Sequence, residues 1–200
     1  MMRKVLVFFV VVGALLGLGW VVMSRAYGVA AEVRDEVRSF TRLNGFNEEY
    51  CVIVDFSRHS GRYRYYLYDI VNDRIAEQGL VAHGGGRNGE CRREPKFSNV
   101  VGSNLSSPGK YRIGRQRKTH FRIRGEHCDC LELHGLESSN SNAYSRAILI
   151  HTGLRYTFPT FPLRTIPTSH GCFTVGNEVF EATAEIVRNS GKPVLLYALE

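Results

Sequence analysis

The chain has 200 residues, of which 44% are apolar and 22% are charged. These ordinary globular values exclude a disordered chain, a collagen and a multi-span membrane protein. Two totals stand out, a net charge of +7 and five cysteines, and the odd count leaves at least one thiol unpaired. Without the apolar N-terminus, about 175 residues remain, which is enough for one well-buried domain.

A long apolar run, residues 5–23, follows Arg3 and Lys4 at the N-terminus. This run of 19 residues is longer than the apolar region of a signal peptide, about 7 to 15 residues, and approaches the roughly 20 residues of a membrane-spanning helix. We therefore expect residues 1–24 to be a signal anchor, with a cleaved signal peptide as the alternative. The basic residues before the run place the N-terminus in the cytoplasm. The rest of the chain is then expected in the periplasm or another extracytoplasmic compartment, anchored to the inner membrane by the N-terminal helix.

Residues 25–46 are expected to form a juxtamembrane helix and linker. Apolar residues between Val29 and Leu43 recur every three to four positions, which is the period of an amphipathic helix. Asn44-Gly45 then offers a C-terminal cap.

Residues 47–200 are expected to form a single, mainly β domain. Strands are predicted at residues 51–56, 62–70, 74–83, 111–113, 121–124, 131–134, 147–151 and 194–198. A helix is predicted from Asn177 to Asn189, with Asn177 as its N-cap and Gly191 beyond its end. Many short strands and one late helix favour a β-sandwich, or a barrel-like domain, with one C-terminal-side helix.

The segment most informative about chemistry is Ser169-His170-Gly171-Cys172, with His151 at the end of an earlier apolar strand. A thiol with a pKa near ~8.5 is mostly protonated at neutral pH, and a nearby imidazole can accept its proton. His151 is therefore a candidate base for Cys172. Gly171 leaves room for a substrate carbonyl and frees the backbone N–H groups of Gly171 and Cys172 to face a developing oxyanion. This pattern predicts a cysteine nucleophile with a histidine base.

Seventeen residues separate His151 from Ser169, and this spacing with the Ser-His-Gly-Cys element resembles the L,D-transpeptidases of bacterial cell walls, with the YkuD-like catalytic domain. Ser-Ser-Pro-Gly-Lys-Tyr at 106–111 resembles the family's Thr-Pro-x-Gly-x-aromatic turn. Other stretches resemble one branch of the family, the murein L,D-transpeptidase catalytic domains: Phe-Ser-Asn at 97–99, Gly-Ser at 102–103, Gly-Leu-Glu at 135–137 and Arg-Ala-Ile-Leu-Ile-His at 146–151. The resemblance covers about residues 50–197.

The resemblance implies Cys172 as nucleophile and His151 as general base, oriented by a backbone carbonyl near Thr152 or Gly153. The residues expected to form the oxyanion and substrate pocket are Gly171, His170, Ser169 and Thr152. In the implied reaction Cys172 attacks the carbonyl of the L-centre of diaminopimelate in a tetrapeptide stem, expels D-alanine and forms a thioester. An amine then resolves the thioester, giving a 3-3 cross-link or protein attachment. No metal or cofactor is implied, and a carbapenem is expected to acylate Cys172.

One departure from the family leaves the outcome of the reaction open. Many members follow the catalytic cysteine with a small apolar residue and an Arg or Asn, whereas this chain reads Phe173-Thr174-Val175. Recognition of a substrate carboxylate is therefore not predicted from these residues. If water replaces the amine, the same thioester chemistry makes an L,D-carboxypeptidase, or a hydrolase that releases protein attached to the wall. An alternative of another class is a non-catalytic wall-binding module with the same fold.

The remaining cysteines allow two further hypotheses. A zinc-dependent exported protein would use His127, Cys128, Cys130 and His134. Structural zinc sites usually space their cysteines by two to four residues, so a Cys-x-Cys strand disfavours zinc. A disulfide from Cys91 to Cys128 or Cys130 is the favoured alternative in an exported domain, Cys51 is expected in the core, and Cys172 is expected to stay free.

A run of basic residues, from Lys110 to Arg124, could suggest nucleic acid as a partner. Because an exported domain does not meet nucleic acid, the run is expected to be a solvated strand face. The functional alternative is attraction toward acidic stem peptides or anionic lipid headgroups.

Overall fold

The structure, a computed structural model, describes residues 28–123 and 125–200. The apolar run predicted to span a membrane, residues 5–23, lies outside these residues. Within them, no helix combines the length and the apolar character that a membrane crossing requires. Glu36–Glu200 form one compact unit, and residues 28–35 belong to the unit that precedes it.

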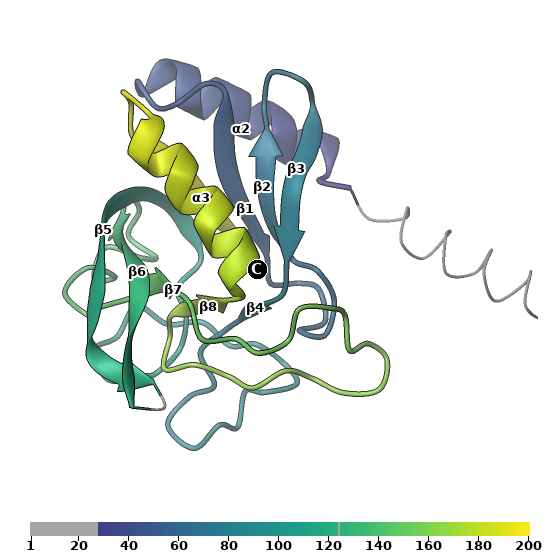
Figure 1. The fold of residues 1–200 in the computed structure, drawn as a ribbon, viewed down its shortest axis with the longest axis vertical. Coiled ribbons are helices and arrows are strands. Elements are labelled where there is room, and N and C mark those ends of the chain that lie inside the picture. The colour runs from purple at the N-terminus through teal and green to yellow at the C-terminus, as the bar shows by residue number, and fades with distance from the viewer. Residues whose placement is uncertain (1–27, 124) are drawn as a thin grey trace, which may run out of the picture. The chain divides into compact units, whose positions relative to one another are not determined.

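The described part of the chain is mainly β, with two helices. The elements in chain order are α2 (Ala31–Leu43), β1 (Tyr50–Asp55), β2 (Tyr65–Asp69), β3 (Arg74–Gly79), β4 (Val81–Ala82), β5 (Gly109–Ile123), β6 (Glu126–Gly135), β7 (Leu149–His151), β8 (Phe173–Val175), α3 (Asn177–Asn189) and β9 (Val194–Leu199). In the described residues the strands form one sheet in the order β3-β2-β1-β9-β5-β6-β7-β8-β4 (Figure 1). The mainly β prediction is confirmed. The predicted two-sheet sandwich is wrong, because the parallel pairs β1–β9 and β7–β8 join all strands into one sheet.

The helices agree well with their sequence signals. α2 ends as expected, since Gly45 has a φ of +71° and the N–H of Phe46 donates to the carbonyl of Thr41 at 2.9 Å. α3 has the predicted bounds, but its N-cap is Gly176 and not Asn177, and no side chain caps its first turn. Asn177 is instead the first helical residue.

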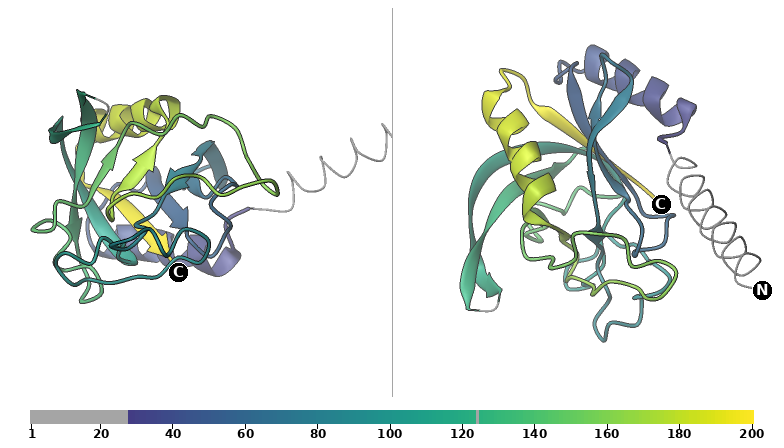
Figure 2. Two further views of the ribbon diagram at one scale, coloured as in Figure 1. Left: turned by 90° about the horizontal axis from the view of Figure 1, so that it is seen from below. Right: turned by 45° about the vertical axis from the view of Figure 1, so that its right-hand side comes forward.

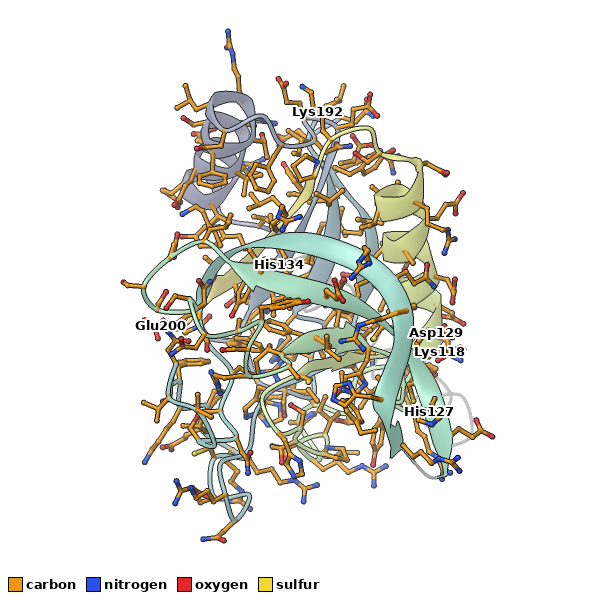
Figure 3. The ribbon with its side chains drawn as sticks, turned by 90° about the vertical axis from the view of Figure 1, so that its left-hand side faces the viewer. Lys118, His127, Asp129, His134, Lys192 and Glu200 are labelled. Atoms are coloured by element: carbon orange, nitrogen blue, oxygen red, sulfur yellow. The ribbon has the colours of Figure 1, made fainter. Side chains whose placement is uncertain are left out.

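The strands differ from the prediction in three places. The segment predicted at 74–83 forms two strands, β3 and β4, which pair with β2 and β8 respectively. The segments predicted at 111–113 and 121–124 belong to one long strand, β5, which pairs with β6 as a curved hairpin (Figure 3). β8 was not predicted, because three residues are too few to show a period. It matters most for function, since it leads directly out of the Ser-His-Gly-Cys segment.

The hydrophobic core lies between α3 and the centre of the sheet. Val52 and Val54 of β1 and Leu196 of β9 are fully buried there and pack in one cluster with Phe180 of α3. β1 is buried on both faces over four consecutive residues, as expected of a strand covered on both sides. Figure 2 shows α3 on one side of these strands and α2, from Glu36 onward, on the other.

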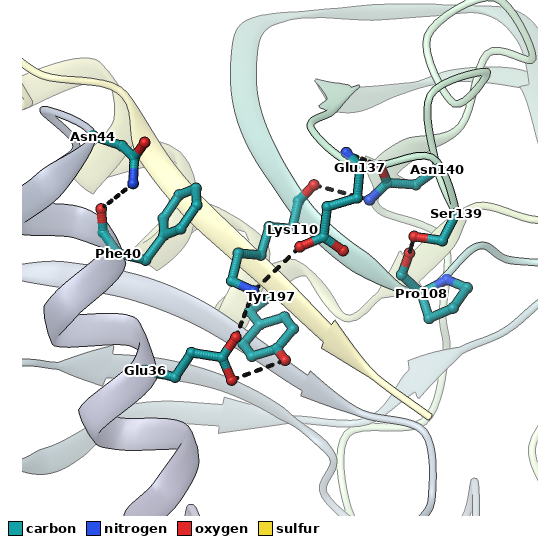
Figure 4. A network of polar contacts seen from close by, with 9 residues as sticks. All are labelled: Glu36, Phe40, Asn44, Pro108, Lys110, Glu137, Ser139, Asn140 and Tyr197. Atoms are coloured by element: carbon teal, nitrogen blue, oxygen red, sulfur yellow. Dashed lines mark hydrogen bonds and ion pairs between the residues drawn. The ribbon is translucent and has the colours of Figure 1, made fainter.

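A buried lysine connects α2 to the sheet (Figure 4). The ammonium of Lys110 lies 2.5 Å from Glu36 Oε1 on α2 and 3.2 Å from Glu137 Oε1. It also lies 4.3 Å from the ring centroid of Tyr197, whose hydroxyl donates to Glu36 Oε2 at 3.1 Å. Lys110 was expected on a solvated strand face, and this is wrong: only 11% of its side chain is exposed, because the helix covers this end of β5.

Replacing Lys110 by Met is expected to lower the free energy of unfolding by about 1 to 2 kcal/mol, because two partly buried carboxylates lose a charged donor. Urea unfolding followed by circular dichroism measures this. Lys118→Met is the matched control on the same strand: its ammonium lies 2.7 Å from Asp129, but its side chain is 64% exposed, so we expect a much smaller loss than for Lys110→Met. Equal losses in the two variants would contradict a structural role for Lys110.

Candidate active site

The two candidate catalytic residues are brought together by neighbouring strands. His151 ends β7, and Cys172 directly precedes β8. These strands pair in parallel, with Ile150 opposite Phe173 and His151 opposite Thr174. Cys172 and His151 both line a cleft of about 1040 Å³, together with Ser169 and His170. Two other predicted pocket residues do not line the cleft: Gly171 and Thr152.

Gly171 shapes the turn that presents Cys172. Its φ is +109°, a conformation that side-chain-bearing residues rarely adopt. A Cβ on Gly171 would lie 2.7 Å from Ile148 Cδ1 and 2.9 Å from the carbonyl oxygen of Leu105. Glycine is therefore required for both backbone conformation and space.

Two serine hydroxyls hold this turn. The hydroxyl of Ser106, fully buried, donates to the carbonyl of Gly171 at 2.9 Å and accepts from the N–H of Gly84 at 2.9 Å. The hydroxyl of Ser169 donates to the carbonyl of Cys172 at 2.6 Å and accepts from the N–H of Gly171 at 3.2 Å. The Gly171 N–H, expected to face a substrate oxyanion, is thus bonded within the turn in this structure.

His151 is held as a neutral imidazole with one defined tautomer. Its Nδ1 lies 2.6 Å from the carbonyl oxygen of Thr152, and since a carbonyl can only accept, Nδ1 carries the hydrogen. Nε2 therefore keeps its lone pair and accepts from the hydroxyl of Thr174 at 3.1 Å. Burial lowers the pKa of His151 below its ordinary value, against the opposing effect of the bond to Thr152. The arrangement can receive a proton at Nε2.

The surroundings of Cys172 favour the protonated thiol. Only 7% of the residue is exposed, and burial raises the pKa of its thiol to about 11, although a hydrogen bond from the Leu149 backbone and the charge of Arg146 act in the opposite direction. The thiol donates to the carbonyl of Ala147, with Sγ 3.5 Å from the oxygen. Ala147 has a φ of +54°, which is uncommon outside glycine and is often found at functional sites. Transfer of the proton to His151 requires the thiol to turn away from this carbonyl.

Arg146 fastens the loop beside the cleft. One guanidinium nitrogen donates to the carbonyl of Ser98 at 2.7 Å and to the hydroxyl of Ser107 at 2.8 Å. The other donates to the hydroxyl of Ser103 at 3.1 Å and to the carbonyl of Leu105 at 2.6 Å. Arg146 thereby holds the segment that contacts Gly171, and its charge is used within the protein.

A buried pair behind the cleft supports the other side of the turn. Arg64, 0% exposed, donates to Nδ1 of His83 at 2.7 Å, and Nε2 of His83 donates to the carbonyl of Cys91 at 2.8 Å. Burial and the charge of Arg64 lower the pKa of His83 to about 4, so the ring stays neutral. The carbonyl of His83 accepts from the N–H of Ser169 at 2.8 Å. This pair therefore fixes the strand end on which the Ser-His-Gly-Cys segment rests.

Sequence reasoning gave no role to Thr174, Ser106 or Arg64. A signal existed for Thr174: residues two apart on a strand face the same side, so position 174 points where position 172 points. No comparable signal existed for Ser106 or Arg64, which reach the site only through long-range contacts.

The predicted disulfide is wrong, since all five cysteines are free thiols. Cys91 is buried beside His83, whereas Cys130 packs with Leu149 and Cys172 below the cleft, so the predicted partners belong to different parts of the fold. Cys51 is fully buried in the core, as expected.

The zinc hypothesis finds no support in residues 28–123 and 125–200, where no group of three or more His, Cys, Asp or Glu side chains is placed to hold a metal ion. His127 and His134 lie at separate points of the β5–β6 hairpin (Figure 3), seven residues apart on one extended strand. That spacing corresponds to roughly 20 Å of strand.

Ser106→Ala is expected to lower the free energy of unfolding by about 1 to 3 kcal/mol, because the N–H of Gly84 loses its buried acceptor. We also expect acylation of Cys172 by a carbapenem to slow by about tenfold, because the turn loses the hydrogen bond from Ser106 to the carbonyl of Gly171. The control is Ser145→Ala, an exposed hydroxyl bonded to the carbonyl of Asn142, with an expected change within about 0.5 kcal/mol. Urea unfolding and acylation kinetics test both effects, and an unchanged acylation rate would show that Ser106 does not position the turn.

Comparison with known families identifies residues 28–197 as matching the L,D-transpeptidase catalytic domain. Among solved structures, the helical cell shape determining protein Pgp2 from Campylobacter jejuni is 16% identical, with a TM-score of 0.45 and coverage of 74% of this chain and 46% of that chain. Bd1075 from Bdellovibrio bacteriovorus is 15% identical, with a TM-score of 0.42 and coverage of 76% and 48%. The chain thus spans about half the length of these proteins. No curated protein matched it.

Proposed function

Since the chain belongs to the family of L,D-transpeptidase catalytic domains, we propose that it is an exported cysteine acyltransferase that remodels peptidoglycan. The observation that carries the proposal is the arrangement of Cys172 and His151 in one cleft, with Nε2 of His151 as the unprotonated ring nitrogen, which can take a proton once the hydroxyl of Thr174 releases it. The proposed location, anchored to the inner membrane and facing the periplasm, rests on the apolar run at residues 5–23 and the basic residues before it.

The base is essential to this chemistry because the thiol is a weak acid. A pKa of about 11 leaves on the order of one thiol in ten thousand ionised at pH 7. Cys172 therefore reacts by transferring its proton to His151 as it attacks, and the bond from His151 Nδ1 to Thr152 keeps the accepting nitrogen in place.

In the first half of the reaction, Nε2 of His151 takes the thiol proton and Sγ of Cys172 forms a bond to the carbonyl carbon at the L-centre of diaminopimelate. The tetrahedral intermediate collapses by breaking the bond to the nitrogen of D-alanine. Nε2 returns the proton to that nitrogen, so D-alanine leaves as an amine and Cys172 holds a thioester.

In the second half, an amine of another stem attacks the thioester and passes a proton to His151. The carbon–sulfur bond breaks, the sulfur regains a proton, and the product is a 3-3 cross-link or an attached protein. With water as the acceptor, the same steps release a shortened stem or a wall-bound protein.

The deciding experiment incubates the full chain with purified tetrapeptide muropeptides and, separately, with sacculi that carry attached protein, and analyses the products by chromatography and mass spectrometry. Cross-linked dimers that accumulate with the release of D-alanine are expected. Tripeptides without dimers would show an L,D-carboxypeptidase, and released peptide–protein adducts would show a wall-protein hydrolase. A folded protein that leaves every substrate unchanged and still binds sacculi would overturn the enzymatic proposal in favour of a wall-binding module.

A further inference from the structure

Among the described residues, those that line the active-site cleft carry positive charge and include no acidic side chain. Among the described residues that line the cleft are Arg122, Arg146 and Arg155, whereas none is Asp or Glu. The charge of Arg146 is directed to the Ser98–Leu105 side of the cleft, where its guanidinium donates to backbone and hydroxyl oxygens. The other two arginines are available to a ligand.

The backbone around Arg155 is held by hydrogen bonds, whereas its side chain has no partner among the described residues. The residue before it, Leu154, donates its N–H to the carbonyl of Val175 at 3.1 Å, and the carbonyl of Thr157 accepts from the hydroxyl of Tyr63 at 3.3 Å. These two contacts fix the loop on both sides of position 155. The exposed guanidinium of Arg155 makes no hydrogen bond or ion pair with any residue that the structure describes.

Arg122 comes from a different wall of the cleft. It follows Phe121 on β5, and the ring of Phe121 lies edge-on to the ring of His151, with 5.7 Å between centroids. Among the residues that the structure describes, its guanidinium bonds only to the carbonyl of Gly125, at 3.2 Å, and its other donors have no partner there. Two cations from separate elements therefore face the space beside the nucleophile.

The proposed substrate has two matching anions close to the reacting carbonyl. When one carboxyl of diaminopimelate is joined to D-alanine, the other is free, and D-alanine contributes a second free carboxylate. Guanidinium groups bind carboxylates through paired, charge-assisted hydrogen bonds. Resting on the proposed function, we propose that Arg122 and Arg155 each bind one of these two carboxylates and so select a stem that carries both.

The test measures kcat/KM of the full chain with a tetrapeptide stem and two analogues, one amidated at the free diaminopimelate carboxyl and one ending in D-alaninamide. Arg155→Gln and Arg122→Gln are each expected to lower kcat/KM on the unmodified stem by roughly 10- to 100-fold. Each variant should show little further loss on the analogue that lacks its own partner carboxylate, and the full loss on the other analogue. Arg155→Lys keeps the charge but not the paired hydrogen bonds, so its kcat/KM should lie between those of Arg155→Gln and the wild type.

Arg93→Gln is the matched control, because Arg93 is exposed and lies outside the cleft, and the substitution removes the same single positive charge. The kcat/KM of this variant is expected within about twofold of the wild type. The proposal that Arg122 and Arg155 each bind one carboxylate is overturned if the wild type acts on the stems but both variants lose the same factor of kcat/KM on all three substrates, or lose none. The proposed function stands in that case. If the wild type acts on no stem, the proposed function itself fails.

Discussion

Replacing Cys172 by Ala is expected to abolish covalent acylation of the protein by a carbapenem. The wild-type chain should gain the mass of one inhibitor molecule, whereas Cys172→Ala should gain none at any time. The physical reason is that, among the described residues, Cys172 is the only cysteine lining the cleft beside the histidine base. Intact-mass spectrometry over a time course measures the result.

Cys130→Ala is the matched control for this experiment. Cys130 packs in the same small cluster as Cys172 but is completely buried and does not line the cleft. Cys130→Ala should therefore be acylated at a rate within a few-fold of the wild type. Its free energy of unfolding should fall by about 1 kcal/mol, because a buried sulfur is deleted. If Cys130→Ala were not acylated and Cys172→Ala were, the nucleophile would be Cys130 and not Cys172.

His151→Gln is expected to slow acylation at pH 7 by about 10² to 10⁴ and to change its pH dependence. In the wild type, the lowered pKa of His151 keeps the imidazole neutral as the pH falls below the ordinary histidine range. The rate should therefore be nearly constant above neutral pH and decline only in acid, where His151 gains a proton and can no longer accept one.

Without the imidazole, reaction depends on spontaneous ionisation of the thiol. Since the pKa of Cys172 is about 11, the rate of His151→Gln should rise about tenfold per pH unit up to that value. Acylation rates measured from pH 5 to pH 10 distinguish the two profiles. His120→Gln is the control, because His120 is exposed, and it should reproduce the wild-type pH profile. A pH profile of His151→Gln parallel to that of the wild type would show that His151 is not the base.

Local patterns predicted the elements that depend on neighbouring residues. The period of the apolar residues predicted α2 and α3, and Gly45 marked the end of α2, because hydrogen bonds within a helix span only a few positions. Period-two runs predicted most of the strands. What such patterns do not contain is which strands pair, so the single sheet and the short β8 emerged only from the fold.

The same distinction explains the errors in the chemistry. The pattern of charges predicted a solvated Lys110, but α2 covers it with Glu36, a residue 74 positions away. The number of cysteines and the expected export of the domain favoured a disulfide, but all five cysteines are free. A disulfide requires two cysteines that lie close together in space, and their separation along the chain does not predict this. Each error concerns a contact between distant segments.

By itself, the sequence determined which chemical groups the chain can use: a thiol after glycine, a histidine separated by 17 residues from the Ser-His-Gly-Cys segment and an apolar N-terminal run. Only the tertiary structure decided the state of those groups. The parallel pairing of β7 and β8 places His151 opposite Thr174, the carbonyl of Thr152 selects the tautomer, and burial keeps the thiol of Cys172 protonated. Proton affinity depends on solvent exclusion and on partners a few ångströms away, and these are properties of the folded chain.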